Sequence, residues 1–430
     1  MNVTGFTVQK SGNAHWPALE AGICLNRTVG CNVSGNRLIN NGFAGISLLD
    51  SQQNTITGNN VTGTGWGGIH LMNSSRNTVS GNILDNNTHV GINGHASSNY
   101  NNITENVITN GAYGMFYHAA TYNNFYRNNI SATDEGLWLQ ETVDHNTAAQ
   151  NNFINNNVSV RLQGSANNTL RDNTLTNYIV GFNLTQYSAN NRLFNNTITN
   201  GHVGVELASS SQNNISYNRL AENNCSIHLS QSNNNRIFDN EIAHNNMSGI
   251  TLRYSSNNRF YHNNLLNNTI QVNILTGSYS NIWDDGCPSG GNYWSDYNGS
   301  DVNRDGLGDA AYVIDTQNVD RYPLVFPVGF FPWDMNEDGY VGVDDIFTAA
   351  VAFGSDPESE RWNPKADLNR DNYVGIDDVQ AIAQNFGRIN PLTSQAYTHS
   401  VCGAKFCPAT QKLIATLQLI KNFTILQAKS

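Results

Sequence analysis

The sequence has few charges, few cysteines and no long apolar run. Only 13% of its 430 residues are charged, and the formal net charge is −11. An acidic chain is a poor match for a polyanion, so nucleic acid is not expected as a partner. No apolar run approaches the ~18 residues that a membrane-spanning helix requires, which excludes a membrane span of that kind. The six cysteines are scattered and indicate no disulfide framework.

The N-terminus also lacks a visible signal peptide. Val3, Phe6 and Val8 fit the strand positions of a coil that begins before the first residue, so we expect the natural start to be missing. At the other end, residues 390–430 differ in composition from everything before them, and we assign them no function.

What the sequence does contain is a repeat of 22 or 23 residues that runs to about residue 283. Each unit begins with a small residue followed by alternating apolar and polar residues, as in G-I-S-L at 45–48 and G-I-H-L at 68–71. Two asparagines follow, five residues apart, as at Asn54 and Asn59. The repeats begin at Gly22, Gly45, Gly68, Gly91, Gly114, Gly136, Ser159, Gly181, Gly204, Ser226, Gly249 and Gln271.

The alternation within each unit predicts β-strands with one buried face. Each unit has room for three short strands and shows no helical pattern. One unit cannot close a core alone, so neighbouring units must stack. The sequence therefore predicts an all-β, right-handed parallel β-helix of about 12 coils over residues 1–283. We expect the asparagines to hold the corners in left-handed backbone and to bond from coil to coil.

The repeat resembles those of pectate-lyase-like β-helix proteins. Together with N-Y-W-S-D-Y at 292–297, it resembles more narrowly the NosD-like group, which is named after a periplasmic copper-binding protein. The resemblance implies the fold but not the activity, because relatives include polysaccharide lyases, glycoside hydrolases and non-catalytic surface proteins.

Stacking the coils predicts which side chains share the outer wall. The residue two places after each repeat start forms one outward row, and the residue four places after forms a second row. Aromatic rings beside amides, an arginine and a carboxylate suit the apolar faces and hydroxyls of sugars. The glycan-contact candidates are Phe116, Trp138, His118, Gln140, Arg161, Gln163 and Glu206.

No catalytic residue is assigned. Hydrolysis requires two carboxylates about 5–9 Å apart, and nothing in the rows pairs well with Glu206. Glu135 falls in a row of valines, so it either points inward or marks a bulge, while Glu141 lies in the following turn. His95 above His118 could bind copper or zinc, but a third ligand is missing.

Residues 284–332 read as a cap over the open end of the β-helix, because the repeat stops there and aromatic and glycine residues appear. This segment contains D-V-N-R-D-G-L-G-D at 301–309. Its oxygen ligands could surround one Ca²⁺, or the segment could be an ordinary turn. The candidate ligands are Asp301, Asn303, Asp305 and Asp309.

Residues 333–389 contain two loops whose hard oxygen ligands have EF-hand spacing. The loops start 33 residues apart and present carboxylates or amides at positions 1, 3, 5 and 12, with a backbone carbonyl at position 7. Gly339 serves the sharp turn at position 6, and Asn372 replaces it in left-handed backbone. The predicted calcium ligands are Asp334, Asn336, Asp338, Tyr340, Asp345, Asp367, Asn369, Asp371, Tyr373 and Asp378.

Only one helix is expected after each loop, at 346–353 and 379–386. Paired loop–helix units of this kind resemble a dockerin module, whose family binds a cohesin domain on a scaffold or surface protein in a calcium-dependent manner. The resemblance implies an extracellular or cell-surface protein that binds or degrades polysaccharide while docked to a cohesin-bearing partner. Two alternatives remain: a non-catalytic surface protein with the β-helix as a spacer, and a NosD-type copper-binding protein.

Overall fold

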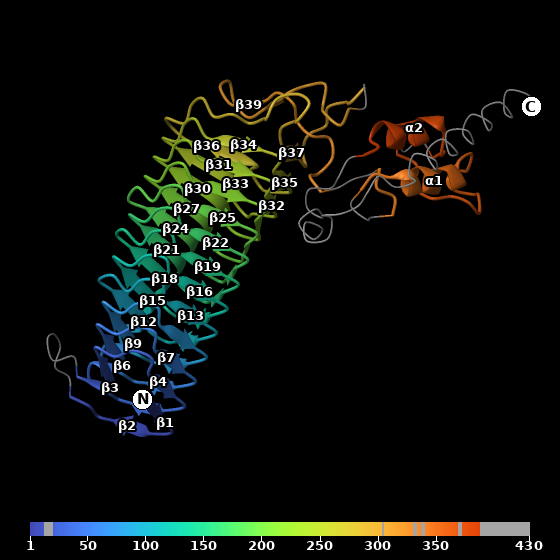
Figure 1. Cartoon of the computed structure of the whole chain (residues 1–430). Coiled ribbons are helices and arrows are strands. Elements are labelled where there is room, and N and C mark those ends of the chain that lie inside the picture. The colour runs from blue at the N-terminus through green and yellow to red at the C-terminus, as the bar shows by residue number, and fades with distance from the viewer. Residues whose placement is uncertain (13–19, 303–304, 330–332, 337–339, 369–371, 388–430) are drawn as a thin grey trace, which may run out of the picture. The chain divides into compact units, whose positions relative to one another are not determined.

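The computed structural model describes residues 1–12, 20–302, 305–329, 333–336, 340–368 and 372–387. Two compact units emerge (Figure 1). The first comprises Met1–Ser300 and Leu307–Val325, and the second comprises Asp301–Gly306 and the described residues from Phe326 onward. Within the described residues, no helix is both long and apolar enough to cross a membrane. The four described cysteines, Cys24, Cys31, Cys225 and Cys287, are free thiols.

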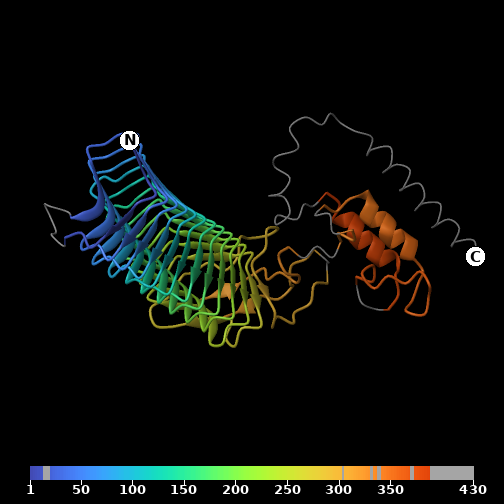
Figure 2. The same ribbon diagram turned by 90° about the horizontal axis from the view of Figure 1, so that it is seen from below.

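The first unit is a parallel β-helix whose turns stack on one another (Figures 1 and 2). Each turn contributes one strand to each of three long sheets. Sheet A contains β1 (Asn2–Thr4), β4 (Asn32–Ser34), β7 (Thr55–Thr57), β10 (Thr78–Ser80), β13 (Asn102–Thr104), β16 (Asn124–Tyr126), β19 (Thr147–Ala149), β22 (Thr169–Arg171), β25 (Arg192–Phe194), β28 (Asn214–Ser216), β31 (Arg236–Phe238) and β34 (Arg259–Tyr261).

The second and third sheets are also built from one strand per turn, in the order of the chain. Sheet B contains β2 (Thr7–Gln9), β5 (Arg37–Ile39), β8 (Asn60–Thr62), β11 (Ile83–Asp85), β14 (Val107–Thr109), β17 (Asn129–Ser131), β20 (Asn152–Ile154), β23 (Thr174–Thr176), β26 (Thr197–Thr199), β29 (Arg219–Ala221), β32 (Glu241–Ala243), β35 (Asn264–Leu266) and β37 (Tyr293–Trp294). Sheet C contains β3 (Ala21–Asn26), β6 (Ala44–Leu49), β9 (Gly67–Met72), β12 (Val90–His95), β15 (Tyr113–His118), β18 (Glu135–Gln140), β21 (Val158–Gln163), β24 (Val180–Thr185), β27 (Val203–Ala208), β30 (Cys225–Ser230), β33 (Ser248–Arg253) and β36 (Val272–Ile274).

Each strand pairs with its equivalent one repeat earlier and one repeat later. Ile46 lies opposite Ile69, and Ile69 lies opposite Ile92, as the repeat spacing predicts. The twelve described strands of sheet C therefore mark about eleven turns, and the all-β solenoid is confirmed. Val3 and Val8 do lie in the first strands, but Phe6 lies between them, is 56% exposed and belongs to no strand.

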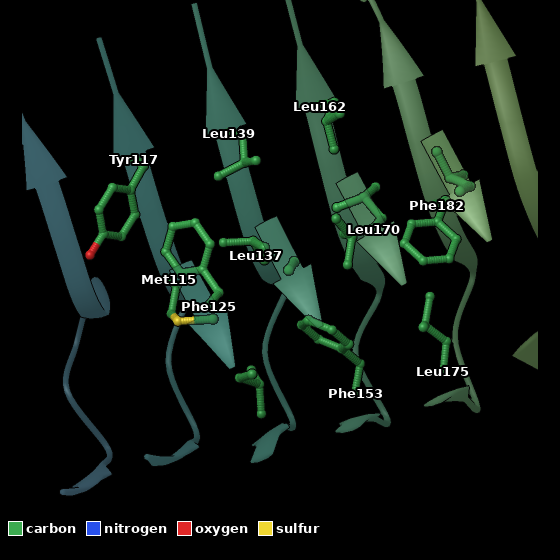
Figure 3. Packing of buried hydrophobic residues seen from close by; sticks show 14 of the residues in the cluster. Met115, Tyr117, Phe125, Leu137, Leu139, Phe153, Leu162, Leu170, Leu175 and Phe182 are labelled. Atoms are coloured by element: carbon green, nitrogen blue, oxygen red, sulfur yellow. The ribbon is translucent and has the colours of Figure 1, made fainter. Parts of the chain in front are cut away.

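The interior of the β-helix is a continuous apolar core to which all three sheets contribute. Leu137 and Leu139 from β18 and Phe153 from β20 point into it (Figure 3). Each is fully buried. Because every buried side chain packs on its equivalent in the next turn, the core is as long as the solenoid.

Ladders of buried asparagine connect the turns. The backbone N–H and the side-chain amide of Asn54 both donate to Oδ1 of Asn77, at 2.9 and 3.1 Å. The amide of Asn77 also donates to the carbonyl of Ser51. The expectation that these asparagines adopt left-handed backbone is wrong. The residue before each one does so instead, as Gln53 does with φ 57°, and the asparagine satisfies the backbone groups that this corner leaves free.

The cap closes the C-terminal end of the core. β37 extends sheet B, so that Trp294 pairs with Leu265, and Asn292 continues the asparagine ladder from Asn263. The ladder ends on Asp320, whose Oδ2 accepts the Asn292 backbone N–H at 2.7 Å and the Trp294 indole N–H at 2.9 Å. Burial raises the pKa of Asp320 to about 6, although these hydrogen bonds oppose the rise. Trp283 and Trp294 thereby seal the apolar end.

The second unit packs two short helices around its own small core. α1 (Val343–Ala352) and α2 (Ile376–Gln384) each begin three residues before the predicted start. The reason is the last aspartate of each loop, which is the third residue of the helix and caps its N-terminus from within the first turn. Asp345 Oδ2 accepts the N–H of Gly342 at 2.6 Å, and Asp378 Oδ2 accepts that of Gly375 at 2.7 Å.

Asn151→Ala tests the ladder. It removes the acceptor of the Asn128 backbone N–H and side-chain amide, at 2.9 and 3.0 Å, and leaves buried donors unsatisfied. We expect the free energy of unfolding of the β-helix to fall by about 2–4 kcal/mol. Chemical denaturation measures it. Asn152→Ala is the matched control, because its side chain makes only an exposed 3.3 Å bond. Equal losses in both variants would contradict the ladder's role.

Candidate functional site

The candidate site lies on the outward face of sheet C, and a break in strand alternation shapes it. Alternation fails at the first residue of each repeat. A Cβ added to Gly45 would lie 2.3 Å from Val61 Cγ1, so this position faces the core. Ile46, the next residue, also faces the core. Two successive inward positions turn the preceding residue, Ala44, outward into a separate cluster with Phe43.

This break decides the position of Glu135. Glu135 occupies the row of Ala44, and its carboxylate forms an ion pair with Arg161 at 2.8 Å on the outer face. The inward alternative is therefore excluded, and the bulge is the correct interpretation. The same row brings Tyr113 outward, beside Trp138 at 5.3 Å between ring centroids.

The predicted outer rows stack in the predicted register. Phe116 pairs with Trp138 and Trp138 with Arg161, while His118, Gln140 and Gln163 pair in the neighbouring row. The rings of Phe116 and Trp138 lie 4.9 Å apart, and the Arg161 guanidinium lies 5.9 Å from the Trp138 ring. Glu206 is not part of this group. It lies on β27, three strands beyond β18, which carries Trp138.

The outward face carries more aromatic side chains than the sequence analysis assigned. Phe43 and Trp66 stack with centroids 5.1 Å apart, and Trp66 contacts His89 at 5.5 Å. His89 meets Tyr113 edge-on at 5.0 Å. We call the whole set the aromatic track, which extends from just before β6 to β18 and consists of Phe43, Trp66, His70, His89, His95, Tyr113, Phe116, His118 and Trp138.

A periodic signal for these residues was present in the sequence. Phe43, Trp66 and His89 recur every 23 residues, two places before the repeat start, whereas the predicted outer rows contain only positions after it. Tyr113 could not be found that way, because its row was assigned to the core and only the bulge turns it outward.

Burial keeps two histidines of the track uncharged. His70 is 5% exposed, and burial lowers its pKa to about 4, although the hydrogen bond between its Nδ1 and Asn93 Oδ1 opposes the shift. Burial also lowers the pKa of His95 to about 4, with a further contribution from His118. At neutral pH these two rings are therefore neutral.

Three glutamates of this face lie beside basic side chains. Besides Glu135 with Arg161, His118 Nε2 lies 3.2 Å from Glu141, and His228 Nδ1 lies 3.7 Å from Glu206. Asp144 has a local role, because it accepts the backbone N–H of Ala166 in the turn.

Several buried polar atoms on this face have no hydrogen-bond partner within the protein. In the row of Phe116 they are Ser47 Oγ, His70 Nε2, Asn93 Nδ2, Trp138 Nε1, Arg161 Nε and Asn183 Oδ1, and in the row of Ala44 Glu135 Oε2. Arg161 Nε and Glu135 Oε2 lie 2.8 Å apart as an ion pair, although they are not aligned as a hydrogen bond. An unsatisfied buried polar atom costs about 1–3 kcal/mol. These atoms are buried, so a ligand on the outer face does not contact them in this structure.

The two glutamates of the outward rows, Glu135 and Glu206, do not form a hydrolytic pair. Glu135 and Glu206 are three strands apart, or about 14 Å at the usual strand spacing, which exceeds the range of known glycosidase pairs. The described residues also include no group of three His, Cys, Asp or Glu side chains placed to hold a metal ion. His70 lies beside His95 at 6.3 Å between ring centroids, yet these histidines do not complete such a group.

The predicted calcium loops of the second unit are described in part, since Asp338, Gly339, Asn369 and Asp371 lie outside the described residues. The carboxylates at positions 1 and 12 of both loops are buried: Asp334, Asp345, Asp367 and Asp378. Asn372 has φ 65°, as expected for a residue that replaces glycine. Buried oxygen ligands of this kind fit Ca²⁺.

The segment 301–309 is divided between the two units, and Asn303 lies outside the described residues. Asp301 accepts the backbone N–H groups of Asp305 and Gly306, at 3.2 and 3.0 Å. Asp309 accepts the Ser300 hydroxyl at 3.0 Å. A calcium site in this segment stays a prediction.

Comparison with family models decides the relationship of the β-helix. The model of NosD, described as a periplasmic copper-binding protein, matches residues 2–169 and again 158–299. The chain belongs to the NosD family. The copper-binding description applies to the family's namesake, and the described residues of this member show no three-residue metal group. No curated protein matches the chain by sequence.

Several solved structures are similar to this NosD-family chain. The Dettilon tailspike protein gp208 matches with a TM-score of 0.51 and 12% identity over 65% of this chain, which spans 63% of the tailspike. The A-module of the Azotobacter vinelandii mannuronan C-5 epimerase AlgE6 matches with a TM-score of 0.49 and 12% identity, over 66% of this chain and 91% of its own. DFA-IIIase of Arthrobacter chlorophenolicus A6 matches at 0.41 and 11%, over 62% and 82%. Identities this low show the fold alone.

The lowered pKa values of His70 and His95 predict acid sensitivity. The unfolded chain binds protons on histidine near pH 6.5, whereas the folded chain does so only near pH 4. Stability is therefore present above pH 6.5 and is lost as pH falls toward 4, by on the order of 3 kcal/mol for the buried His70 and less for the partly exposed His95. We expect the double variant His70→Gln/His95→Gln to lose less between these pH values.

Chemical denaturation at a series of pH values measures this loss. The difference between the wild type and the double variant isolates the two histidines, because every other titrating group is common to both proteins. Parallel stability curves across the whole range would contradict the burial argument.

Proposed function

We propose that the outward face of sheet C binds polysaccharide and that the second unit tethers the protein to a partner. The single observation that carries the first part is the aromatic track, which gives each turn from β9 to β18 at least one partly exposed ring. Aromatic faces stack on the apolar faces of sugar rings, and the flanking amides of Gln140 and Gln163 suit sugar hydroxyls.

Binding is the function that the geometry supports, rather than turnover. Glu135 and Glu206 are too far apart along the axis for hydrolysis, and Arg161, the only arginine in the outward rows of β6 to β30, is paired with Glu135. In this proposal the β-helix presents a carbohydrate-binding surface and has no assigned catalytic residue.

For the second unit we propose a calcium-binding dockerin that docks on a cohesin domain. The two halves repeat the same local geometry. Asp345 Oδ1 accepts the N–H of Met335 at 2.6 Å, and Asp378 Oδ1 accepts the N–H of Leu368 at 2.8 Å. Calcium would neutralise the buried carboxylates at the start and end of each loop and so stabilise the fold. A cohesin partner implies an extracellular or cell-surface location.

The docking face that we propose is α1, because the two helices differ in their exposed residues. Phe347 and Val351 on α1 are 62% and 52% exposed and lie one turn apart. The equivalent positions of α2 hold Gln380 and Gln384, both exposed. An exposed apolar pair on one helix and amides on the other favour a partner that binds α1.

Trp138→Ala tests glycan binding. The change removes a ring that contacts both Phe116 and Tyr113, so the affinity for a bound polysaccharide should fall by about tenfold or more. Calorimetry on the full chain measures it after a glycan array has identified the ligand. Phe238→Ala is the control, since Phe238 stacks on Tyr261 on the outer face of sheet A. If the wild-type protein binds no glycan, the glycan-binding proposal is contradicted and the alternative role of the β-helix as a spacer is favoured.

Calcium removal and α1 substitution together test docking. We expect a chelator to unfold the second unit while the β-helix keeps its circular dichroism signal, because the metal-binding energy contributes to the folding energy of that unit. Phe347→Gln/Val351→Gln should retain calcium-dependent folding and lose capture by a panel of cohesin domains.

Gln380→Ala/Gln384→Ala is the matched change on α2 and should still be captured. Loss of capture only in the α2 variant would place the docking face on α2. Retention of folded second-unit signal in excess chelator would contradict the calcium requirement.

A further inference from the structure

We propose, on the basis of the glycan-binding role above, that the ligand of sheet C is an uncharged polysaccharide and not a polymer of uronic acids. The proposal rests on the lack of an unpaired lysine or arginine in the outward rows of β6 to β30, together with the neutral aromatic surface and the partly exposed amides of this face.

Cations are almost missing from this face. Among the outward rows of β6 to β30, Arg161 is the only lysine or arginine. Its guanidinium lies 2.8 Å from Glu135, and the side chains of the pair are only 27% and 14% exposed. A carboxylate of a uronan would have to compete with Glu135 for the same guanidinium in a partly buried position, where the two anions repel each other.

The remaining charges on the face favour the same ligand. Asp134, adjacent to Glu135, accepts the side-chain amide of Asn157 at 2.9 Å. Glu206 lies beside His228 at 3.7 Å. These carboxylates repel a polyanion laid along the solenoid, whereas a neutral chain experiences no such repulsion.

The aromatic track adds surface without charge. His70 and His95 lie among Phe43, Trp66 and Phe116, with centroids 5.3–5.4 Å apart, and burial lowers the pKa of both imidazoles. At neutral pH they act as apolar rings and not as cations. Stacking on such rings depends on the apolar face of a sugar and requires no ionic group.

The partly exposed amides of Gln140 and Gln163 suit hydroxyl groups, because each amide offers both a donor and an acceptor. A sugar hydroxyl can both donate and accept, so it satisfies either kind of atom. Successive turns are about 4.8 Å apart, comparable with the length of one sugar residue in an extended chain. The ligand would therefore run along the solenoid axis.

The experiment compares matched oligosaccharides. Calorimetry on the calcium-loaded full chain would use neutral hexasaccharides (cello-, manno- and xylo-oligomers) and acidic hexasaccharides (oligogalacturonate and oligomannuronate). We expect at least one neutral ligand to bind about tenfold or more tightly than either acidic one. Its affinity should change little between about 0.05 and 0.5 M salt, because no ion pair with the ligand is formed.

Glu135→Gln sharpens the test. Removal of this carboxylate frees Arg161, so acidic oligosaccharides should gain affinity by about tenfold while neutral ones change little. The matched control is Glu241→Gln, which frees Arg219 from a 3.2 Å ion pair between β29 and β32, on a different sheet. Glu241→Gln should leave acidic binding unchanged.

The possible outcomes separate the two levels of the proposal. Preference for neutral ligands, lost affinity in Trp138→Ala and gained acidic affinity in Glu135→Gln support it. Wild-type binding of acidic ligands at equal or higher affinity, sensitive to Trp138→Ala, would overturn the uncharged class and leave glycan binding in place. Binding of none of the ligands would overturn both.

Discussion

The whole first unit depends on one constraint: each turn must place its residues on the equivalent residues of the next. Parallel pairing fixes this register, and the asparagine ladders enforce it through buried side-chain bonds such as those from Asn54 to Asn77. A slip by one residue would move a buried face outward and leave ladder donors unsatisfied. The same constraint turns a repeated sequence position into a continuous outer row, so a property shared by several repeats becomes a property of a surface.

That amplification explains why a face without an evident catalytic group can still have a function. One aromatic residue is a weak contact, but a ring in each of several consecutive turns forms an extended platform for an extended ligand. The ion pair of Glu135 with Arg161 sits at one end of this platform and removes its only permanent cation. The proposed dockerin would tether this binding surface to its partner and so hold the partner near a polysaccharide.

The sequence predicted the strands and the register, because a period of 22 or 23 residues leaves little freedom once the core must be closed. It placed Phe116, Trp138 and Arg161 in adjacent positions correctly. It did not predict the outward turn of Glu135 and Tyr113, because the alternation breaks at the glycine row, and only the backbone shows two successive residues facing the core. The helix starts in the second unit were missed because Asp345 and Asp378 cap the helices that follow.

The most direct test is a crystal structure of the protein with a neutral hexasaccharide bound. The account predicts sugar rings aligned with the solenoid axis over the outward face of sheet C, in contact with Trp66, Tyr113 or Trp138. A ligand seated on sheet A or sheet B, or outward rows in which Phe116 and Trp138 do not lie on successive turns, would contradict it.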